Sequence, residues 1–241
     1  DPDLYPNVNW RDVILNKRVW QNQEFLSVAG GGTAARYYLS LSILSKDGVF
    51  KQDKSCHDYN TNVGYTKYSF LSKIDANLTK RTTLSLKLNQ VIVDNDGPGL
   101  SDNNTLWSAQ ANLTPVTMPV KYSNGQLSSF GKNGDQISPY VQLNEMGYKQ
   151  NRRLNTDLSV VIDQNLDFLT KGLKVRGMFS YSGQSEHNTT HFKMPDVYIA
   201  KGRYGDGSLH TERTIEKKDE SYGQQVIFNR NYYWELNGSY N

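Results

Sequence analysis

The chain has 241 residues, of which 37% are hydrophobic and 12% aromatic, and its mean hydropathy is −0.68. A water-soluble domain of this length usually carries more apolar residues for its core, whereas a transmembrane β-barrel needs them only at alternate positions of each strand. The formal net charge is only +3 and no long basic run occurs, which argues against a nucleic-acid partner. No stretch approaches the roughly 18 consecutive apolar residues of a membrane helix.

Period-two alternation recurs along the chain in stretches close to the length of a membrane strand, which is about 9–11 residues. In residues 68–78, for example, Phe70 and Ile74 fall on one face of the expected strand, and Lys73 and Asp75 fall on the other. Each such strand would have one apolar and one polar face. We predict seven strands, at residues 21–29, 36–44, 68–78, 84–93, 154–166, 173–181 and 232–240.

The connections between these strands alternate strictly between short and long. Short periplasmic turns and long extracellular loops are typical of transmembrane barrels. The pattern therefore predicts an all-β fold, an antiparallel transmembrane β-barrel segment, which further strands outside this sequence would complete because bacterial barrels have even strand numbers. We expect a connecting segment at residues 1–18, barrel wall at 19–241, and long extracellular loops near 45–67, 94–153 and 182–231.

Charged and amide side chains on the polar faces of the strands are expected to line the lumen. Their mixed signs indicate pairing with a plug inside the barrel and not a channel of one charge. The residues concerned are Lys73, Asp75, Lys87, Asn89, Asp157, Asp163, Lys174 and Arg176.

Two of the long loops are rich in aromatic residues. Flat aromatic faces flanked by amides and carboxylates suit sugar rings, which have apolar faces and hydroxyl rims. The same aromatics could instead pack the loops or contact a partner protein, and residues 105–112 could form a short bracing helix. The ligand-binding candidates are Trp107, Tyr122, Tyr140, Tyr148 and Tyr198.

Motifs for catalysis are missing from the sequence, so we expect no enzyme activity, no cofactor and no metal site. His187 and His191 stand four residues apart, which suits a metal only on a helix, and the residues between them favour extended structure. The spacing of Asp94, Asp96 and Asp102 does not fit a calcium-binding EF-hand loop. The single cysteine, Cys56, is expected to be a loop residue without a specific function.

Several segments, taken in order, resemble the SusC/RagA-like TonB-dependent outer-membrane transporters of Bacteroidetes. Individually these strings are of modest specificity, but together they extend over much of the chain. They are LYPNVNWRD at 4–12, LSVAGG at 26–31, ARYYLSL at 35–41, KDGVF at 46–50, IDANLTKR at 74–81 and FLTKGLKVRGMFSY at 168–181.

The resemblance implies a barrel of roughly 22 strands in the bacterial outer membrane, with a plug in its lumen and energy supplied through TonB. Members of this family import oligosaccharides, or less often peptides, with a SusD-like surface lipoprotein acting as a lid. The plug and the TonB box do not occur in this sequence. Expected partners are therefore the SusD-like lipoprotein, the TonB complex through those missing parts, the ligand and the lipid bilayer.

Two other readings of the strands stay open at this point. A passive outer-membrane porin or adhesin would have similar strands without a plug or TonB coupling. A soluble β-sandwich binding module would also show period-two alternation, but it would fold without detergent.

Overall fold

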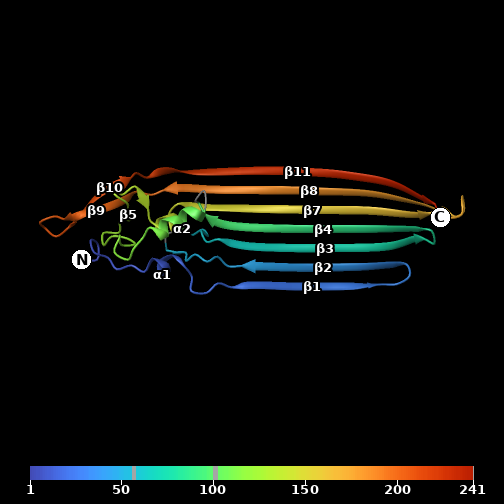
Figure 1. Cartoon of the computed structure of the whole chain (residues 1–241), viewed down its shortest axis with the longest axis horizontal. Coiled ribbons are helices and arrows are strands. Elements are labelled where there is room, and N and C mark those ends of the chain that lie inside the picture. Colours follow the sequence, from blue (N-terminus) through green and yellow to red (C-terminus); the bar gives the residue numbers. More distant parts are fainter. Residues whose placement is uncertain (56–57, 100–102, 241) are drawn as a thin grey trace.

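In the computed structural model, which describes residues 1–55, 58–99 and 103–240, seven long strands lie side by side in one antiparallel sheet (Figure 1). Their order across the sheet is β1-β2-β3-β4-β7-β8-β11, so each strand pairs with its neighbour in the sequence of long strands. The strands are β1 (Gln21–Gly31), β2 (Ala35–Lys46), β3 (Gly64–Thr79), β4 (Thr82–Pro98), β7 (Gly147–Asn165), β8 (Leu173–Met194) and β11 (Lys218–Tyr240).

Six of the seven predicted stretches lie within one of these strands, and the stretch at 154–166 ends one residue past β7. The predicted all-β antiparallel class is confirmed. The sheet is open, with β1 and β11 at its edges. A closed barrel of roughly 22 strands therefore stays a prediction.

The strands from β3 onward extend beyond the predicted stretches, mainly toward the end of the sheet that carries the long connections. β7 has 19 residues, β8 has 22 and β11 has 23. The three loops predicted near 45–67, 94–153 and 182–231 are correspondingly shorter. Residues at the two ends of each predicted loop belong to the flanking strands, where they continue the ladder of backbone hydrogen bonds. These extensions are mostly polar, and the apolar Val226, Ile227 and Phe228 of β11 are consecutive, so they carry no clear period-two signal. The connections observed are residues 47–63, 99–146 and 195–217.

The opposite end of the sheet has only short turns, at residues 32–34, 80–81 and 166–172. In the longest of them, the carboxylate of Asp167 accepts a hydrogen bond of 2.8 Å from the backbone N–H of Gly172. Gly172 has a φ of 86°, which disfavours side-chain-bearing residues there. The alternation of short and long connections predicted from the sequence is therefore present in the structure.

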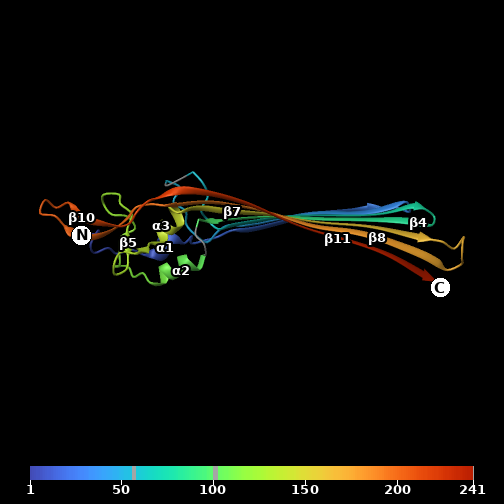
Figure 2. The ribbon, with the colours of Figure 1, turned by 90° about the horizontal axis from the view of Figure 1, so that it is seen from above.

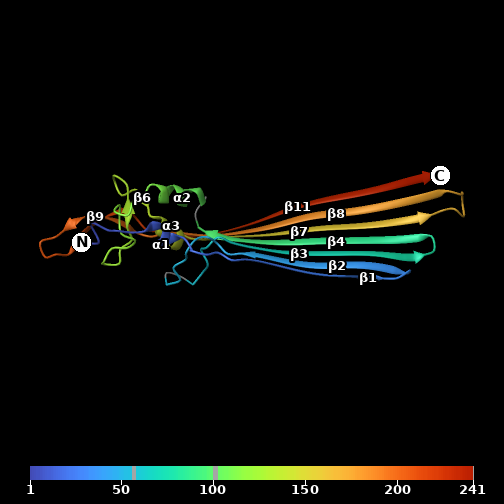
Figure 3. The same ribbon diagram turned by 60° about the horizontal axis from the view of Figure 1, so that its bottom comes forward.

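The long connections and the N-terminal segment together form what we call the cap, which consists of the described residues within 1–20, 47–63, 99–146 and 195–217. In Figures 2 and 3 the cap lies at one end of the sheet and the short turns lie at the other. The expected helix near 105–112 is present at Asn103–Ala111. The cap contains α1 (Trp10–Ile14), α2 (Asn103–Ala111), β5 (Ser129–Phe130), β6 (Gln136–Ile137), α3 (Pro139–Asn144), β9 (Val197–Arg203) and β10 (Leu209–Ile215).

The hydrophobic core lies in the cap and not in the sheet. α3 is its centre, since every residue of this helix is buried. Its start is determined by Ser138, whose hydroxyl caps the N–H of Val141 at 3.1 Å, and by Pro139 in the first turn. The other large buried side chains of the cluster are Trp10, Phe50, Leu106, Met118, Phe130, Met146 and Val197.

The sheet, by contrast, has one apolar and one polar face that both remain largely uncovered by the chain. Because side chains alternate and paired residues share a face, the register aligns Tyr37, Ile74, Leu86, Val160, Phe179 and Trp234 across the apolar face. Across the polar face it pairs Lys73 with Lys87, Asn89 with Asp157, and Asp163 with Arg176.

The polar face contains the residues predicted to line a lumen, and some of them pair with each other. The amide of Asn89 donates to the carboxylate of Asp157 at 3.2 Å. Arg176 lies 3.9 Å from Asp163 in a solvent-exposed ion pair. Among the helices of the described residues, none is both long and apolar enough to cross a membrane.

Candidate functional site

A small cleft lies between α2 and the cap end of strands β2 and β3, on the side of the polar face. It has a volume of about 290 Å³ and is lined by Trp107, Phe50, Tyr65 and Lys46, among others. The Trp107 and Phe50 rings lie 5.4 Å apart, and Trp107 keeps 42% of its surface exposed although Phe50 is buried. Lys46 lies over the ring of its cross-strand partner Tyr65, 5.8 Å from the centroid. The cleft therefore presents aromatic surface beside a cation.

A larger polar cleft of about 740 Å³ adjoins the first, and Lys46, Asp47 and Tyr65 line both. Amides, carboxylates and further cations make up much of the rest of its wall, together with Tyr59, Ser45 and Thr66. We refer to the two together as the cap cleft. The additional polar lining residues are Asn16, Arg18, Gln52, Lys54, Asp58, Asn60, Asn62 and Asp96.

Hydrogen bonds to neighbouring cap elements hold the wall of the cap cleft in place. The side-chain amide of Asn16 donates to the carbonyls of Gly48 at 3.2 Å and Phe50 at 2.7 Å. Farther along, the Tyr140 hydroxyl on α3 donates to the carboxylate of Asp53 at 2.6 Å. Hydrogen bonds from Ser55 and then from Tyr140 hold the pKa of Asp53 well below its usual range, so this carboxylate stays charged. The loop is thus tied to the buried helix.

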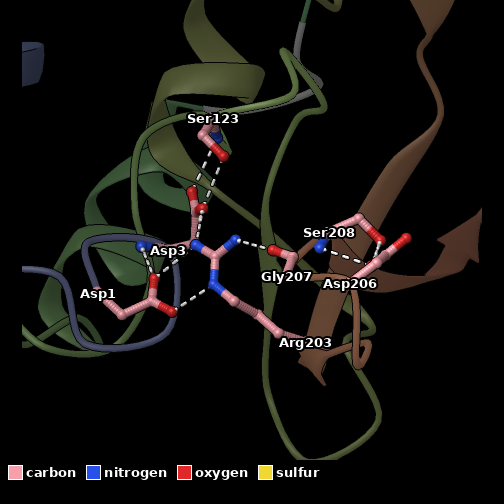
Figure 4. Close-up of polar contacts among 7 residues, drawn as sticks. All are labelled: Asp1, Asp3, Ser123, Arg203, Asp206, Gly207 and Ser208. Carbon is pink, nitrogen blue, oxygen red and sulfur yellow. Dashed lines mark hydrogen bonds and ion pairs between the residues drawn. The ribbon is translucent and has the colours of Figure 1, made fainter.

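A second polar network, the latch, joins the N-terminus to the β9–β10 hairpin (Figure 4). The guanidinium of Arg203 donates to Asp1 at 2.6 and 2.9 Å and to Asp3 at 2.8 Å. Its remaining branch donates to the carbonyl of Gly207 at 3.0 Å. The buried Asp3 carboxylate also accepts from the N–H and hydroxyl of Ser123, at 2.8 and 2.7 Å. Three parts of the cap are therefore held by one arginine and two carboxylates.

Replacing Arg203 with alanine is expected to destabilise the cap by about 2 kcal/mol, because Asp3 would stay buried and charged with fewer partners. Hydrogen exchange of the cap amides would measure this as a lower free energy of local opening. Arg213→Ala is the matched control, since the Arg213 ion pairs are at the surface and such pairs contribute less than about 1 kcal/mol. Equal losses in both variants would contradict the proposed importance of the latch.

The latch is also expected to weaken in acid. Burial alone would raise the pKa of Asp3, but the hydrogen bonds from Ser123 and the charge of Arg203 outweigh it and hold the pKa below its ordinary value. A lowered folded-state pKa adds stability that is fully present above the ordinary carboxyl pKa of about 3.9 and is lost as the pH falls through the lowered value. Cap opening measured against pH should therefore depend more steeply on acid in the wild type than in Asp3→Asn, and parallel curves would exclude this role of Asp3.

The five aromatic ligand candidates occupy different places, and the structure does not bring them together. Trp107 lies in the cap cleft. Tyr122 and Tyr140 are buried in the cap, where the Tyr122 hydroxyl accepts a hydrogen bond of 2.9 Å from the N–H of Ala200. Both tyrosines pack the cap in this structure.

The other two candidates lie on strands. Tyr148, on β7, has the same parity as the apolar face, and its ring lies 5.0 Å from Tyr59 and 5.3 Å from His191. Tyr198, on β9, is half-buried. Its backbone N–H donates a hydrogen bond to the carbonyl of Leu127, and its carbonyl accepts one from the hydroxyl of Ser129. Tyr148 and Tyr198 thus lie outside the lining of the cap cleft.

Most of the cap-cleft residues belong to a connection that sequence reasoning did not single out. Lys46, Asp47, Asn60, Asn62 and Tyr65 lie in or beside residues 47–63. The one available signal was the concentration of asparagines with Tyr59 and Tyr65, which is the same mixture of amides and aromatics that drew attention to the next loop.

The residues weighed as metal ligands take other roles. His187 and His191 lie on strand β8, where a spacing of four residues corresponds to about 13 Å, too far to share an ion. Asp94 is engaged by Arg152 through hydrogen bonds of 2.6 and 2.9 Å. In the described ranges no group of three or more His, Cys, Asp or Glu could hold a metal. Cys56 and Asp102 lie outside the residues that the structure describes.

The chain that forms this long antiparallel sheet was compared with known proteins at the level of sequence and of structure. No protein-family model matches the chain. Over 218 residues the chain is 25% identical to the TonB-dependent receptor P26 of Formosa agariphila. The aligned residues make up 89% of this chain and 20% of that receptor. The resemblance to TonB-dependent receptors predicted from the sequence is confirmed by this relative. That the relative is a receptor agrees with the expectation that the chain is not an enzyme.

Similar solved structures include the RagAB peptide transporter, with a TM-score of 0.40, 11% identity and coverage of 97% of this chain and 31% of that one. The RagAB peptide importer in its open-open state has a TM-score of 0.39, 14% identity and coverage of 96% and 31%. The chain thus spans about a fifth of the length of the curated relative and about a third of these structures.

Proposed function

We propose that this chain is part of the wall and outer loops of a SusC/RagA-like TonB-dependent importer in the bacterial outer membrane. In this proposal the apolar face of the sheet contacts lipid, the polar face lines the lumen, the short turns face the periplasm, and the cap faces the exterior. The edge strands β1 and β11 would pair with further strands of a barrel of roughly 22.

The observation that carries the proposal is a contrast in burial: the sheet exposes large apolar side chains, whereas the cap buries them. Leu26 keeps 71% of its surface exposed and Trp234 keeps 80%, although both lie on the apolar face of the long sheet. The cap of the same chain buries its large apolar side chains almost completely. An apolar band of this extent needs a cover, and a bilayer covers strands that alternate in this way.

The cargo is proposed from the chemistry of the cap cleft. Trp107 and Tyr65 offer aromatic surface, and the adjoining wall offers amides, carboxylates and cations. This combination suits the ring faces and hydroxyls of an oligosaccharide, and its amides and charges also suit a peptide. We propose that the ligand is delivered with a SusD-like lipoprotein above the cap, and that TonB acts through a plug encoded elsewhere in the complete protein.

The proposal is tested with the complete protein in its own bacterium. We expect it to fractionate with the outer membrane, and uptake of its ligand to stop when TonB is deleted. A passive porin or adhesin would fractionate in the same way, but deletion of TonB would leave its activity intact. A complete protein that stays soluble and monomeric without detergent would contradict the membrane assignment altogether.

Trp107→Ala in the complete transporter is expected to weaken binding of the imported oligosaccharide or peptide about tenfold, because a partly exposed tryptophan is a frequent anchor of binding energy. Isothermal titration calorimetry with that ligand gives the Kd. Trp20→Ala is the matched control, since Trp20 is also exposed but does not line the cap cleft. Unchanged affinity in Trp107→Ala would remove Trp107 from the site.

A further inference from the structure

One cation lies on the apolar face of the sheet, beside aromatic residues. Arg230, on β11, pairs in register with Gly183, which in turn pairs with Thr156. Paired residues share a face, so Arg230 projects from the same side as the neighbouring apolar-face residues Tyr181 and Tyr232. Within the described part of the chain, Arg230 has no ion-pair partner.

Arg230 borders a groove of about 310 Å³, which we call the Arg230 groove. Its floor is formed where Gly183 has no side chain and Tyr181 lies over the glycine instead. Phe228 lines it on the side of the cap, and Thr156 and Ser185 add hydroxyl groups. The groove therefore combines apolar side chains with one cation and two hydroxyl groups, and Gln184 and Asn229 complete its lining.

The position along the strands explains how a cation can occupy an apolar face. Tyr181 and Tyr232 lie with ring centroids 5.4 Å apart, next to Arg230 on the side of the short turns. Tyrosines gather where a bilayer meets water. Beyond the groove toward the cap, the apolar face becomes mixed, since Val226 continues it on β11 but Arg152 and Asp94 form a bonded pair on β7 and β4. Arg230 would thus lie at the level of lipid headgroups, where the cost of a cation is small.

We propose that the Arg230 groove binds the anionic headgroup of a membrane lipid, with its phosphate at Arg230 and its acyl chain along Tyr181 and Tyr232. This inference rests on the proposed function for the bilayer around the sheet. Charge complementarity identifies the occupant, because an arginine without an acidic partner beside two hydroxyls suits a phosphate, and the apolar walls suit an acyl chain.

The experiment compares lipid retention by the complete protein, wild type and Arg230→Gln. Each is reconstituted in vesicles of equal parts phosphatidylglycerol, which is anionic, and phosphatidylcholine, which is zwitterionic, then extracted in mild detergent. Native mass spectrometry measures bound lipid. We expect the wild type to retain phosphatidylglycerol preferentially. In Arg230→Gln the ratio of bound phosphatidylglycerol to bound phosphatidylcholine should fall about fivefold. Arg11→Gln, which removes an exposed cation from the cap, should behave as the wild type, and Arg230→Lys should retain part of the preference.

The outcomes separate this inference from the proposed function. Heat-dependent gel migration reports whether each protein has formed a barrel in the vesicles. Barrel formation with equal retention of phosphatidylglycerol by the wild type and Arg230→Gln would overturn the lipid site and leave the proposed function standing. Failure of the wild-type protein to insert would overturn the proposed function itself.

Discussion

Replacing Leu88 with arginine is expected to lower the free energy of unfolding of the protein in a bilayer by about 2–4 kcal/mol. This is the cost of a cation on the lipid face near the midplane. Leu88 lies on the apolar face of β4, paired with Ser72 on β3 and Leu158 on β7. Denaturant titration of the complete protein in vesicles measures the change.

The adjacent residue provides the control for this prediction. Asn89 points to the polar face and bonds Asp157, so an arginine there would meet a carboxylate. We expect Asn89→Arg to change the folding free energy by less than about 1 kcal/mol. If the two arginine variants were equally stable, the apolar face would not be in contact with lipid.

Replacing Leu143 with alanine is expected to destabilise the cap by about 2–5 kcal/mol, through lost apolar contact and the cavity that remains. Leu143 lies on α3 and is completely buried in the core cluster. Hydrogen exchange should show faster opening of cap amides, while amides in the middle of β3 and β4 keep their protection.

Leu169→Ala is the control for the cap core. Leu169 lies in the turn at residues 166–172 and is largely exposed, so its loss should have little effect on either region. A Leu143→Ala protein in which sheet and cap amides open together would show that the two parts are one cooperative unit.

The sequence predicted the sheet well, because apolar alternation and turn spacing are local signals. Residues 154–166 were recognised in β7 since Leu154, Leu158 and Ile162 repeat on one face. The first part of the same strand was missed, because Gln150 and Arg152 on one face are as polar as their neighbours on the other. Backbone pairing with β4 and β8 holds that part in the sheet.

The cap was less predictable, although two of its elements had recognisable signals. Ser138 followed by Pro139 is a typical helix start, and it precedes the buried α3. Asp206 followed by Gly207 is a typical hairpin turn, and it connects β9 and β10. Burial of Tyr122 and Tyr140, however, depends on how distant segments pack around them, and no local pattern encodes this.

The cap cleft could be predicted least. Trp107 was identified as a candidate from its loop, but its aromatic and cationic neighbours come from the ends of β2 and β3. Strand register brings Lys46 opposite Tyr65, and the packing of α2 adds Trp107. A site assembled from three separate segments has no signature at a fixed sequence spacing.

The latch imposes an order of assembly on the molecule. Arg203 and Asp1 are 202 residues apart in the chain, so the N-terminus has no latch partner until β9 has been synthesised and delivered. Bringing such distant residues together costs entropy that the intervening hairpins must first reduce by pairing one after another. The cap would therefore close late, after the strands below it have aligned. Until then the Asp3 carboxylate would stay in water, so a segment that precedes all seven strands in the chain is among the last to reach its final environment.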